Sequence, residues 1–96
     1  MYLIRDVFKC KPGMAKDLVK NFKLTIPFME AQQFNNVKIM TDVVSNYWTV
    51  VLEGEVNNLA AFENHKGFTS QPEVKEIMTG YMDLVNSGYR EIFKIE

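Results

Sequence analysis

The spacing of hydrophobic and polar residues predicts four strands and one long helix. Residues 2–10, 37–43, 47–55 and 89–96 each have the alternating pattern of a strand and are separated by turn residues. The segment that begins at Met14 has a helical period instead. Its apolar side chains recur every three or four positions. They predict a buried face made of Ala15, Leu18, Val19, Phe22, Ile26 and Met29.

Prolines mark the beginning and the later part of this helix. Pro12 and Gly13 follow the first strand, and proline suits a helix start because its φ is already helical. Pro27 lies inside the helical pattern and has no N–H to donate to the carbonyl four residues earlier. We therefore expect a kink or a break at Pro27, with residues 28–33 as a tilted extension.

The strand at 47–55 is apolar on both faces. Trp48, Val50 and Leu52 share one face, and the alternate positions from Tyr47 to Val51 share the other. A strand with one face in water should carry a polar residue at every second position. Helices can cover one face of this strand, but so short a chain has little left to cover the other. We infer that a partner subunit covers the second face.

A short helix is predicted after that strand. Asn57 or Asn58 can cap its first turn, Phe62 and His65 lie on its apolar stripe, and Gly67 ends it.

A longer helix is predicted after the short one. A capping box at Ser70–Glu73, with Pro72 in the first turn, predicts where it begins. Its apolar face extends from Val74 to Val85 and includes Gly80 inside the helix, at a cost of about 1 kcal/mol relative to alanine. Turn residues at 86–88 are expected to end it before the last strand.

The predicted order of elements is strand, helix, strand, strand, helix pair, strand. This is the order of the split βαβ, or ferredoxin-like, arrangement. We therefore predict an α+β fold over residues 1–96 as one domain, with a four-stranded antiparallel sheet and helices on one face. Residues 45–46 form the turn of an antiparallel hairpin between the second and third strands.

Charged residues near the two ends of the chain are expected to meet. Arg90 and Glu91 alternate on the last strand and so point to opposite faces. They cannot pair with each other within one strand. A neighbouring strand can supply a partner for either, such as Asp6 or Arg5 on the first strand, and one of these two first-strand residues could point into a cavity.

Composition excludes several classes of function. Lysine and arginine total 11 and acidic residues 12, and they are interleaved rather than gathered in the basic stripe that a nucleic acid requires. Cys10 is the only cysteine, so one chain can form neither a disulfide nor a multi-thiolate metal site. The first residues lack the apolar core of a signal peptide, and no run approaches the ~18 apolar residues of a membrane span. We expect a cytoplasmic protein that binds neither nucleic acid nor membrane.

The segment from Phe8 to Gly13, followed by an amphipathic helix, resembles the opening of the dimeric α+β barrel proteins. The resemblance is greatest to the NIPSNAP-like and antibiotic-biosynthesis-monooxygenase-like branches. Residues 85–92, with the sequence VNSGYREI, look like the closing segment of small uncharacterised barrel proteins in that group. The resemblance implies a homodimer in which two sheets pack face to face, with the helices of each subunit outside.

The same resemblance implies several chemistries, because its members include cofactor-independent monooxygenases, haem-degrading enzymes and isomerases. The haem-degrading branch has an Asn, Trp, His set. Here Asp6 stands at the matching first-strand position, and Trp48 and His65 do not have that branch's spacing. The monooxygenase branch holds a phenolic substrate with polar and aromatic groups, and Trp48, Tyr81, His65 and Arg90 are of those types.

Candidate catalytic residues are few. His65 is the only side chain that ordinarily titrates near neutral pH and is the default general base, although a solvated or capping histidine is the alternative. Asp6 is the second candidate. No spacing of metal ligands, phosphate-binding loop or dinucleotide fingerprint occurs, so we predict no metal and no cofactor. The residues predicted to contact a ligand are Trp48, Phe62, Tyr81 and Arg90.

Three functions are compatible with the sequence. The first is a homodimeric barrel of unassigned reaction that binds a small hydrophobic or aromatic molecule in a cleft between sheet and helices. The second is a cofactor-independent monooxygenase that uses the same cleft. The third is a structural dimerisation module without a ligand. Six methionines and seven phenylalanines could line an adaptable apolar pocket, although core packing is the more common reason for such residues.

Overall fold

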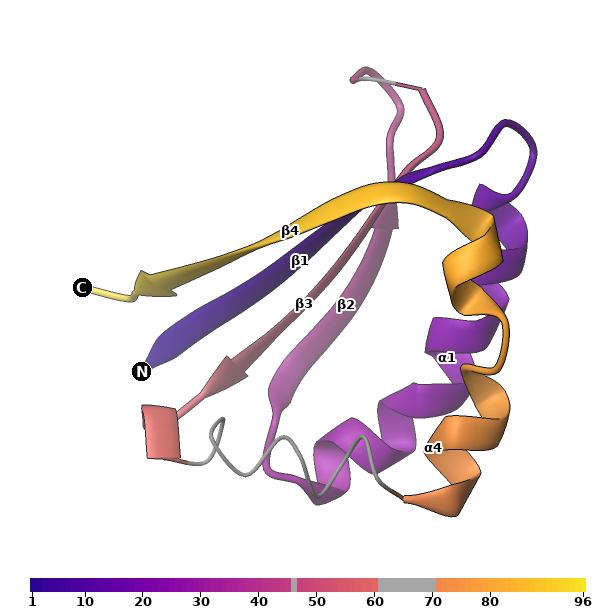
Figure 1. Cartoon of the computed structure of the whole chain (residues 1–96). Helices are drawn as coiled ribbons and strands as arrows, with labels where there is room; N and C mark the ends of the chain where they lie inside the picture. The colour runs from indigo at the N-terminus through magenta and orange to yellow at the C-terminus, as the bar shows by residue number, and fades with distance from the viewer. Residues whose placement is uncertain (46, 61–70) are drawn as a thin grey trace.

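A computed structural model describes residues 1–45, 47–60 and 71–96. Its strands and helices follow the predicted order, with α1 packed across the sheet and α4 beside α1 (Figure 1). The elements are β1 (Tyr2–Cys10), α1 (Ala15–Ala31), β2 (Asn35–Thr41), β3 (Thr49–Val56), α4 (Pro72–Ile77), the 3₁₀ helix η1 (Tyr81–Leu84) and β4 (Val85–Lys94).

The four strands form one antiparallel sheet in the order β2-β3-β1-β4. This is the predicted ferredoxin-like arrangement, and the α+β fold class is confirmed. Both central strands pair along nearly their whole length, with Phe8 opposite Val50 and Gly88, and Ile4 opposite Gly54 and Ile92. All described helices lie on one side of the sheet, and no described element covers the other side (Figure 1). We call this uncovered side the open face.

Helix α1 follows the predicted apolar period. Leu18, Phe22, Thr25 and Met29 are buried and recur every three or four residues, and Thr25 satisfies its hydroxyl by donating to the carbonyl of Phe22 at 2.8 Å. The polar side chain therefore adds no unmet hydrogen bond to the core.

The helix does not break at Pro27, because α1 continues to Ala31, and the kink predicted as the alternative stays a prediction. Pro27 is exposed, so the ring lies on the solvent side of the helix. The carbonyl that loses its intrahelical donor belongs to Lys23, which is also exposed. Water can satisfy that oxygen, and the helix tolerates the proline.

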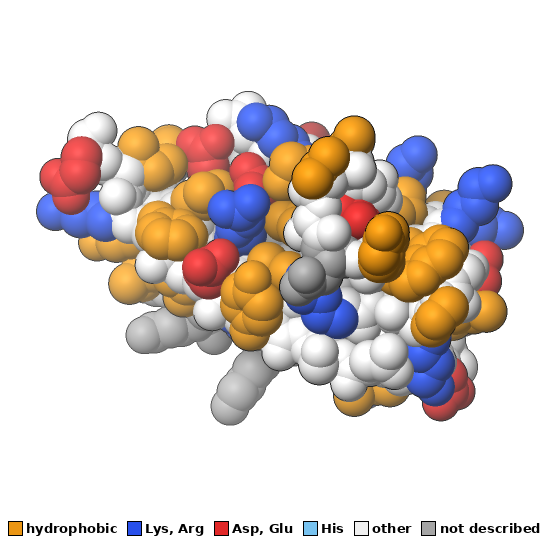
Figure 2. Space-filling view, turned by 90° about the horizontal axis from the view of Figure 1, so that it is seen from above, with side chains coloured by type: hydrophobic (Ala, Val, Ile, Leu, Met, Phe, Trp, Pro, Cys, Tyr) orange, Lys and Arg blue, Asp and Glu red, His pale blue; other side chains and the backbone are white. Residues whose placement is uncertain are grey.

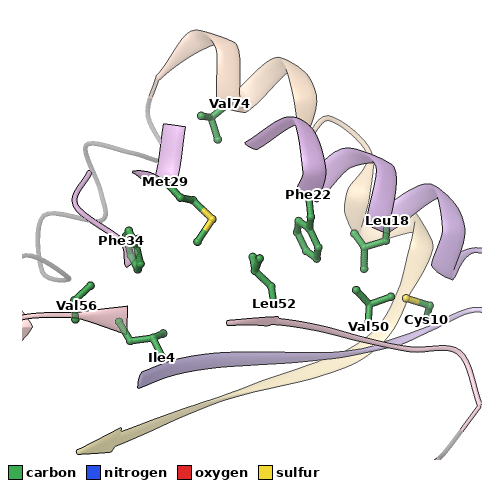
Figure 3. Packing of buried hydrophobic residues seen from close by; sticks show 10 residues of the cluster. All are labelled: Ile4, Cys10, Leu18, Phe22, Met29, Phe34, Val50, Leu52, Val56 and Val74. Atoms are coloured by element: carbon green, nitrogen blue, oxygen red, sulfur yellow. The ribbon is translucent and has the colours of Figure 1, made fainter. Parts of the chain in front are cut away.

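The core lies between α1, α4 and the helix-covered face of the sheet. In Figure 3, Phe22 and Met29 project from α1 towards Leu52 of β3, and Val74 of α4 points into the same space. Leu18 and Val50 are fully buried where helix and sheet approach each other. Burial of these side chains contributes about 1.5–3 kcal/mol each.

Strand β3 begins later than predicted. Trp48 has a φ of +62°, precedes the strand and is 43% exposed, so it is not a mid-strand residue on the Val50 face. Its carbonyl accepts a hydrogen bond from Cys10 N–H at 2.8 Å, while Asp42 accepts one from Thr49 N–H at 2.9 Å. These bonds hold the two ends of the loop between β2 and β3. Strand β2 therefore ends at Thr41, two residues before its predicted end. Val43, which was predicted to belong to β2, is therefore 96% exposed in the loop.

The C-terminal half also departs from the prediction. The helix predicted to reach Val85 ends at Ile77, because Gly80 adopts a φ of +80° and begins the separate helix η1. Gly80 is thus a left-handed turn residue and not a helix-interior one. Residues 86–88, predicted as a turn, belong to β4, which starts at Val85.

Parts of the prediction concern residues that the structure does not describe. The short helix that carries Phe62 and His65 lies outside the described ranges, and so does Ser70 of the predicted capping box. The N-cap of α4 is Gln71, with Pro72 at the first helical position as predicted. Within residues 1–45, 47–60 and 71–96, no helix is long and apolar enough to cross a membrane.

Candidate functional site

A cavity of about 390 Å³ lies between the sheet, α1 and the α4–η1 segment. Its wall is mainly apolar, which is typical of sites for small organic molecules. Strands contribute from below and helices from above, in the space that Figure 3 shows between Leu52, Phe22, Met29 and Val74. The apolar lining residues are Ile4, Phe8, Phe22, Met29, Phe34, Leu52, Val74 and Met78.

Two glycines shape this space. A side chain at Gly54 would place its Cβ 3.1 Å from Cδ1 of Phe34, so the missing side chain lets Phe34 pack over β3. A Cβ at Gly88 would lie 3.1 Å from the carbonyl oxygen of Val7 and 3.3 Å from Cδ1 of Phe8. Both glycines face the helix-covered side by register, opposite Ile4 and Phe8 of β1. Their missing side chains let two aromatic side chains of the cavity wall approach the strand backbone closely.

An ion pair supplies part of the polar cavity wall, which Thr25, Glu53 and Lys75 also line. Asp6 and Arg90 are direct partners in the β1–β4 register, and both line the cavity. Arg90 donates through Nε to Oδ1 of Asp6 at 2.6 Å and through Nη2 to Oδ2 at 3.1 Å. This two-point geometry holds the guanidinium and the carboxylate in one plane. The side-chain hydrogen bond to Asp6 raises the pKa of Arg90 above its usual range, against partial burial that lowers it.

Tyr81 stands at the start of η1 and also lines the cavity. The left-handed turn at Gly80 directs the chain from α4 into η1, and thereby positions Tyr81 over the sheet. Among the described residues, Tyr81 makes no side-chain hydrogen bond. A phenol and a carboxylate–guanidinium pair therefore share one largely apolar cavity, and can bind a hydroxyl or carbonyl of a bound molecule.

The structure brings together three of the predicted site residues. Asp6, Tyr81 and Arg90 line the cavity, and Arg90 pairs with Asp6, one of the two first-strand partners that the sequence left open. Trp48 is elsewhere, in a shallow hollow beside α1 that Val19 also lines. His65 and Phe62 lie outside the described residues.

Sequence reasoning missed most of the apolar wall. Phe22 and Met29 were assigned to the helix face only as core, and Phe34 was not singled out. A helical period identifies which residues turn inward but cannot separate those that touch the sheet from those that border a space. The one sequence signal that pointed to Phe34 was Gly54 on β3, because a glycine within a strand leaves room for a large neighbouring side chain.

Metal chemistry has no support in the described ranges, where no three His, Cys, Asp or Glu side chains gather as possible ligands. Cys10 is buried in the core, and its burial raises the pKa of the thiol. A buried thiol with a raised pKa is a poor nucleophile. The polar residues of the cavity wall include a carboxylate, a guanidinium and a phenol, which suit polar recognition and proton transfer.

Comparisons with known proteins identify the fold. No family model and no curated protein matches the sequence. Solved structures do match it. A NIPSNAP family protein of unknown function from Agrobacterium tumefaciens is 14% identical, with a TM-score of 0.85 over 99% of this chain and 87% of that one. An uncharacterised NIPSNAP domain protein from Burkholderia xenovorans is 8% identical, with a TM-score of 0.83 over 100% of this chain and 95% of that one.

A protein from Mycobacterium tuberculosis is similar over the same length, with 12% identity and a TM-score of 0.76 over 99% of this chain and 94% of that one. Identities this low carry the fold and not the chemistry. The resemblance first read from residues 8–13 and 85–92 agrees with these neighbours in architecture. The chain has the α+β fold of the NIPSNAP family proteins.

Proposed function

We propose that this protein is a homodimeric barrel that binds a small hydrophobic or aromatic molecule, bearing at least one polar group, in the cavity beneath α1. The observation that carries the proposal is the cavity itself, which is apolar over most of its wall and has Asp6, Arg90 and Tyr81 among its polar lining residues. A volume of about 390 Å³ matches the size range of ordinary small-molecule sites.

The polar groups favour an aromatic or aliphatic ligand with a hydroxyl or carbonyl over a pure hydrocarbon. The carboxylate of Asp6 can accept a hydrogen bond from a ligand hydroxyl, and Tyr81 can donate one or accept one. A hydrocarbon would leave the ion pair partly desolvated and without compensation, at a cost in affinity.

Cofactor-independent oxygenation of a phenolic ligand is the second candidate. The observation that favours it is the placement of the Asp6 carboxylate in an apolar cavity, where it can take a proton from a phenol. A dimerisation module without a ligand is the remaining alternative, and it requires that the cavity bind nothing.

Titration of a fluorescent aromatic alcohol, 2-naphthol, followed by its emission change, tests the binding proposal. The variant Met78→Trp fills the cavity from its wall, and Met82→Trp adds the same bulk to a side chain that is 67% exposed in η1. We expect the wild-type protein and Met82→Trp to bind equally, and Met78→Trp to bind at least about 10-fold more weakly. Equal binding by both variants, or none by the wild type, would contradict the proposal.

Native mass spectrometry of the purified protein tests assembly and retained ligand together. A dimer with additional mass would support both parts of the proposal and would give the ligand's mass for identification. A monomer at micromolar concentration would contradict the barrel. Activity is then tested by adding oxygen and the identified ligand to the wild type and to Asp6→Asn, with oxygen consumption as the readout.

A further inference from the structure

The loop between β2 and β3 carries the most exposed large hydrophobic side chains of the described residues. Val43 is 96% exposed, Val44 94% and Tyr47 85%, while Trp48 at the base of the loop is 43% exposed. A single exposed apolar side chain needs no explanation, but several on one loop form a patch. Such a patch on a folded protein ordinarily contacts a partner or a membrane. We call these four residues the loop patch.

Hydrogen bonds fix the base of this loop to the end of the sheet. Asp42 accepts a hydrogen bond from Thr49 N–H at 2.9 Å, and Cys10 N–H donates to the carbonyl of Trp48 at 2.8 Å. Beyond this base the loop projects past the end of the strands, at the top of Figure 1. The apolar side chains of the loop patch are therefore presented from an ordered base, which lowers the cost of ordering it on contact.

Lysines of α1 lie beside the aromatic half of the loop patch. Lys16 and Lys23 line the same shallow hollow as Tyr47 and Trp48. Lys20 lies between these two lysines in the sequence, and spacings of four and three residues place all three on one side of the helix. All three are exposed. A row of ammonium groups thus borders the two aromatic side chains.

Positive charge is concentrated at this end of the molecule. Residues 9–23 contain five lysines and one acidic residue, Asp17, which leaves six basic and eleven acidic residues for the rest of the chain. These fifteen residues comprise the end of β1, the following turn and the first half of α1. Figure 2 views the protein from the side to which the loop projects in Figure 1, and shows hydrophobic side chains with blue ones beside them. A positive end on a chain of net charge −1 orients the protein towards an anionic surface.

From this arrangement we infer that the loop patch and the α1 lysines dock the protein on an anionic lipid surface. Val43 and Val44 enter the edge of the acyl layer, Tyr47 and Trp48 lie at the level of the headgroups, and the lysines contact lipid phosphates. Tyrosine and tryptophan prefer that interfacial level, and lysines near an anionic leaflet are attracted to it. The exposed fraction falls from Val43 to Trp48 in the same order as this depth. The inference rests on neither the cavity nor the homodimer of the proposed function.

A lipid surface fits the loop patch better than a protein partner does. Stable protein interfaces bury about 1,200–2,000 Å², and a projecting loop offers a flat partner only its tip. Lipids instead surround a projecting side chain on every side. The sequence predicted no membrane binding because it has no apolar span, but a peripheral contact needs none. The hollow beside α1 lies on the helix-covered side, so association through the open face would leave it accessible.

Trp48 is the only tryptophan of the chain, so its fluorescence tests the inference directly. We expect its emission to shift to shorter wavelength with vesicles of equal parts phosphatidylcholine and phosphatidylglycerol, and to stay unchanged with phosphatidylcholine alone. Co-sedimentation with the anionic vesicles should weaken as salt is raised. Two double variants, Val43→Ser with Val44→Ser and Lys16→Gln with Lys23→Gln, should each lower the partition coefficient about 10-fold.

Matched double variants outside the loop patch serve as controls. Met82→Ser with Ile95→Ser removes two exposed apolar side chains from other elements, and Lys38→Gln with Lys94→Gln removes the same charge from exposed positions elsewhere. Both should bind the anionic vesicles within about 2-fold of the wild type. Circular dichroism and 2-naphthol binding establish that each variant is folded with an intact cavity.

Several outcomes would overturn the inference. The first is an emission maximum that does not move with anionic vesicles, and the second is equal binding to neutral vesicles, which removes the role of the lysines. A shift to shorter wavelength without vesicles that grows with protein concentration would assign the loop patch to a protein contact between copies instead. Binding that the valine and lysine variants retain in full would place the lipid contact on another surface. None of these results bears on 2-naphthol binding in the cavity.

Discussion

The two faces of the sheet treat two neighbouring charges of β1 in opposite ways. Asp6 points under the helices and meets Arg90 with two hydrogen bonds, the shorter at 2.6 Å. Arg5 points to the open face and approaches Glu53 no closer than 3.8 Å at Nε. Among the described residues, both carboxylate oxygens of Asp6 accept hydrogen bonds, whereas Nε of Arg5 is buried and makes none. If the proposed homodimer forms, we expect the open face to be the one that takes part in the association.

Hydrophobic residues divide less sharply, because Val7 of the open face is only 5% exposed and Ile92 of the helix-covered face is 44% exposed. Ile4 and Leu52 are almost fully buried on the helix-covered face, although a cavity remains beside them. On the open face, Tyr89 and Phe93 of β4 are about half exposed, at 55% and 45%. Exposed aromatic groups beside interleaved charges are typical of a surface that binds a partner.

The largest expected effect comes from a comparison of two adjacent residues of β1 that point to opposite faces of the sheet. Ile4→Ala should lower the free energy of unfolding by about 2–5 kcal/mol, because it removes a buried side chain from the core. Leu3→Ala, one position earlier on the open face, should cost the isolated chain less than about 1 kcal/mol. Urea denaturation at low protein concentration measures both. Equal costs would contradict the division between the helix-covered face and the open face.

The two ion pairs provide the next comparison. Asp6→Asn should lower the free energy of unfolding by about 1 kcal/mol, a value reduced because the Arg90 side chain is 42% exposed. Glu53→Gln should cost less than about 0.5 kcal/mol in the monomer, since its contact with Arg5 is long. Thermal unfolding of both variants gives the comparison. A larger loss for Glu53→Gln in monomer would show that the open-face pair is the stronger one.

Substitution of Gly80 by alanine should change the stability in opposite directions for a helix-interior glycine and for a left-handed turn glycine. A helix-interior glycine should be stabilised by alanine, by about 1 kcal/mol. Because Gly80 has a φ of +80°, Gly80→Ala should instead destabilise by about 1 kcal/mol, although nothing lies within 4 Å of the added Cβ. Gly13→Ala, with the same φ and equally open space, should behave alike. A Gly80→Ala variant that is more stable than the wild type would contradict this prediction. It would indicate that the helix continues through residue 80, an arrangement that would displace Tyr81 from the cavity wall.

The smallest effect concerns pH and the buried core. Burial raises the pKa of the Cys10 thiol above its ordinary value of 9.0. A raised folded-state pKa means that the neutral thiol stabilises the fold below that ordinary value, and that this contribution is lost as the pH rises through the higher folded-state value. The stability of wild type should therefore fall more than that of Cys10→Ala between about pH 8 and pH 10. Parallel curves for the two proteins would contradict the prediction.

Sequence reasoning was accurate where one local signal was strong. The alternation at 2–10 predicted the bounds of β1, and the order of elements predicted the ferredoxin-like topology. It failed where backbone conformation overrode side-chain pattern. Gly80 ended a helix whose apolar period continued beyond it, and the positive φ of Trp48 removed an apparent strand residue from the sheet. A period records which side chains are apolar but not the φ that the backbone adopts.

The sequence by itself determined the layers, because alternation and helical period state which side of each element avoids water. It also determined the opposite orientation of Arg5 and Asp6, since neighbours on a strand point to opposite faces. Only the tertiary structure decided that Asp6 meets Arg90 and that a cavity remains beside Leu52. These features depend on strand register, which joins residues more than 80 positions apart in the case of Asp6 and Arg90. The period along one strand cannot fix that register.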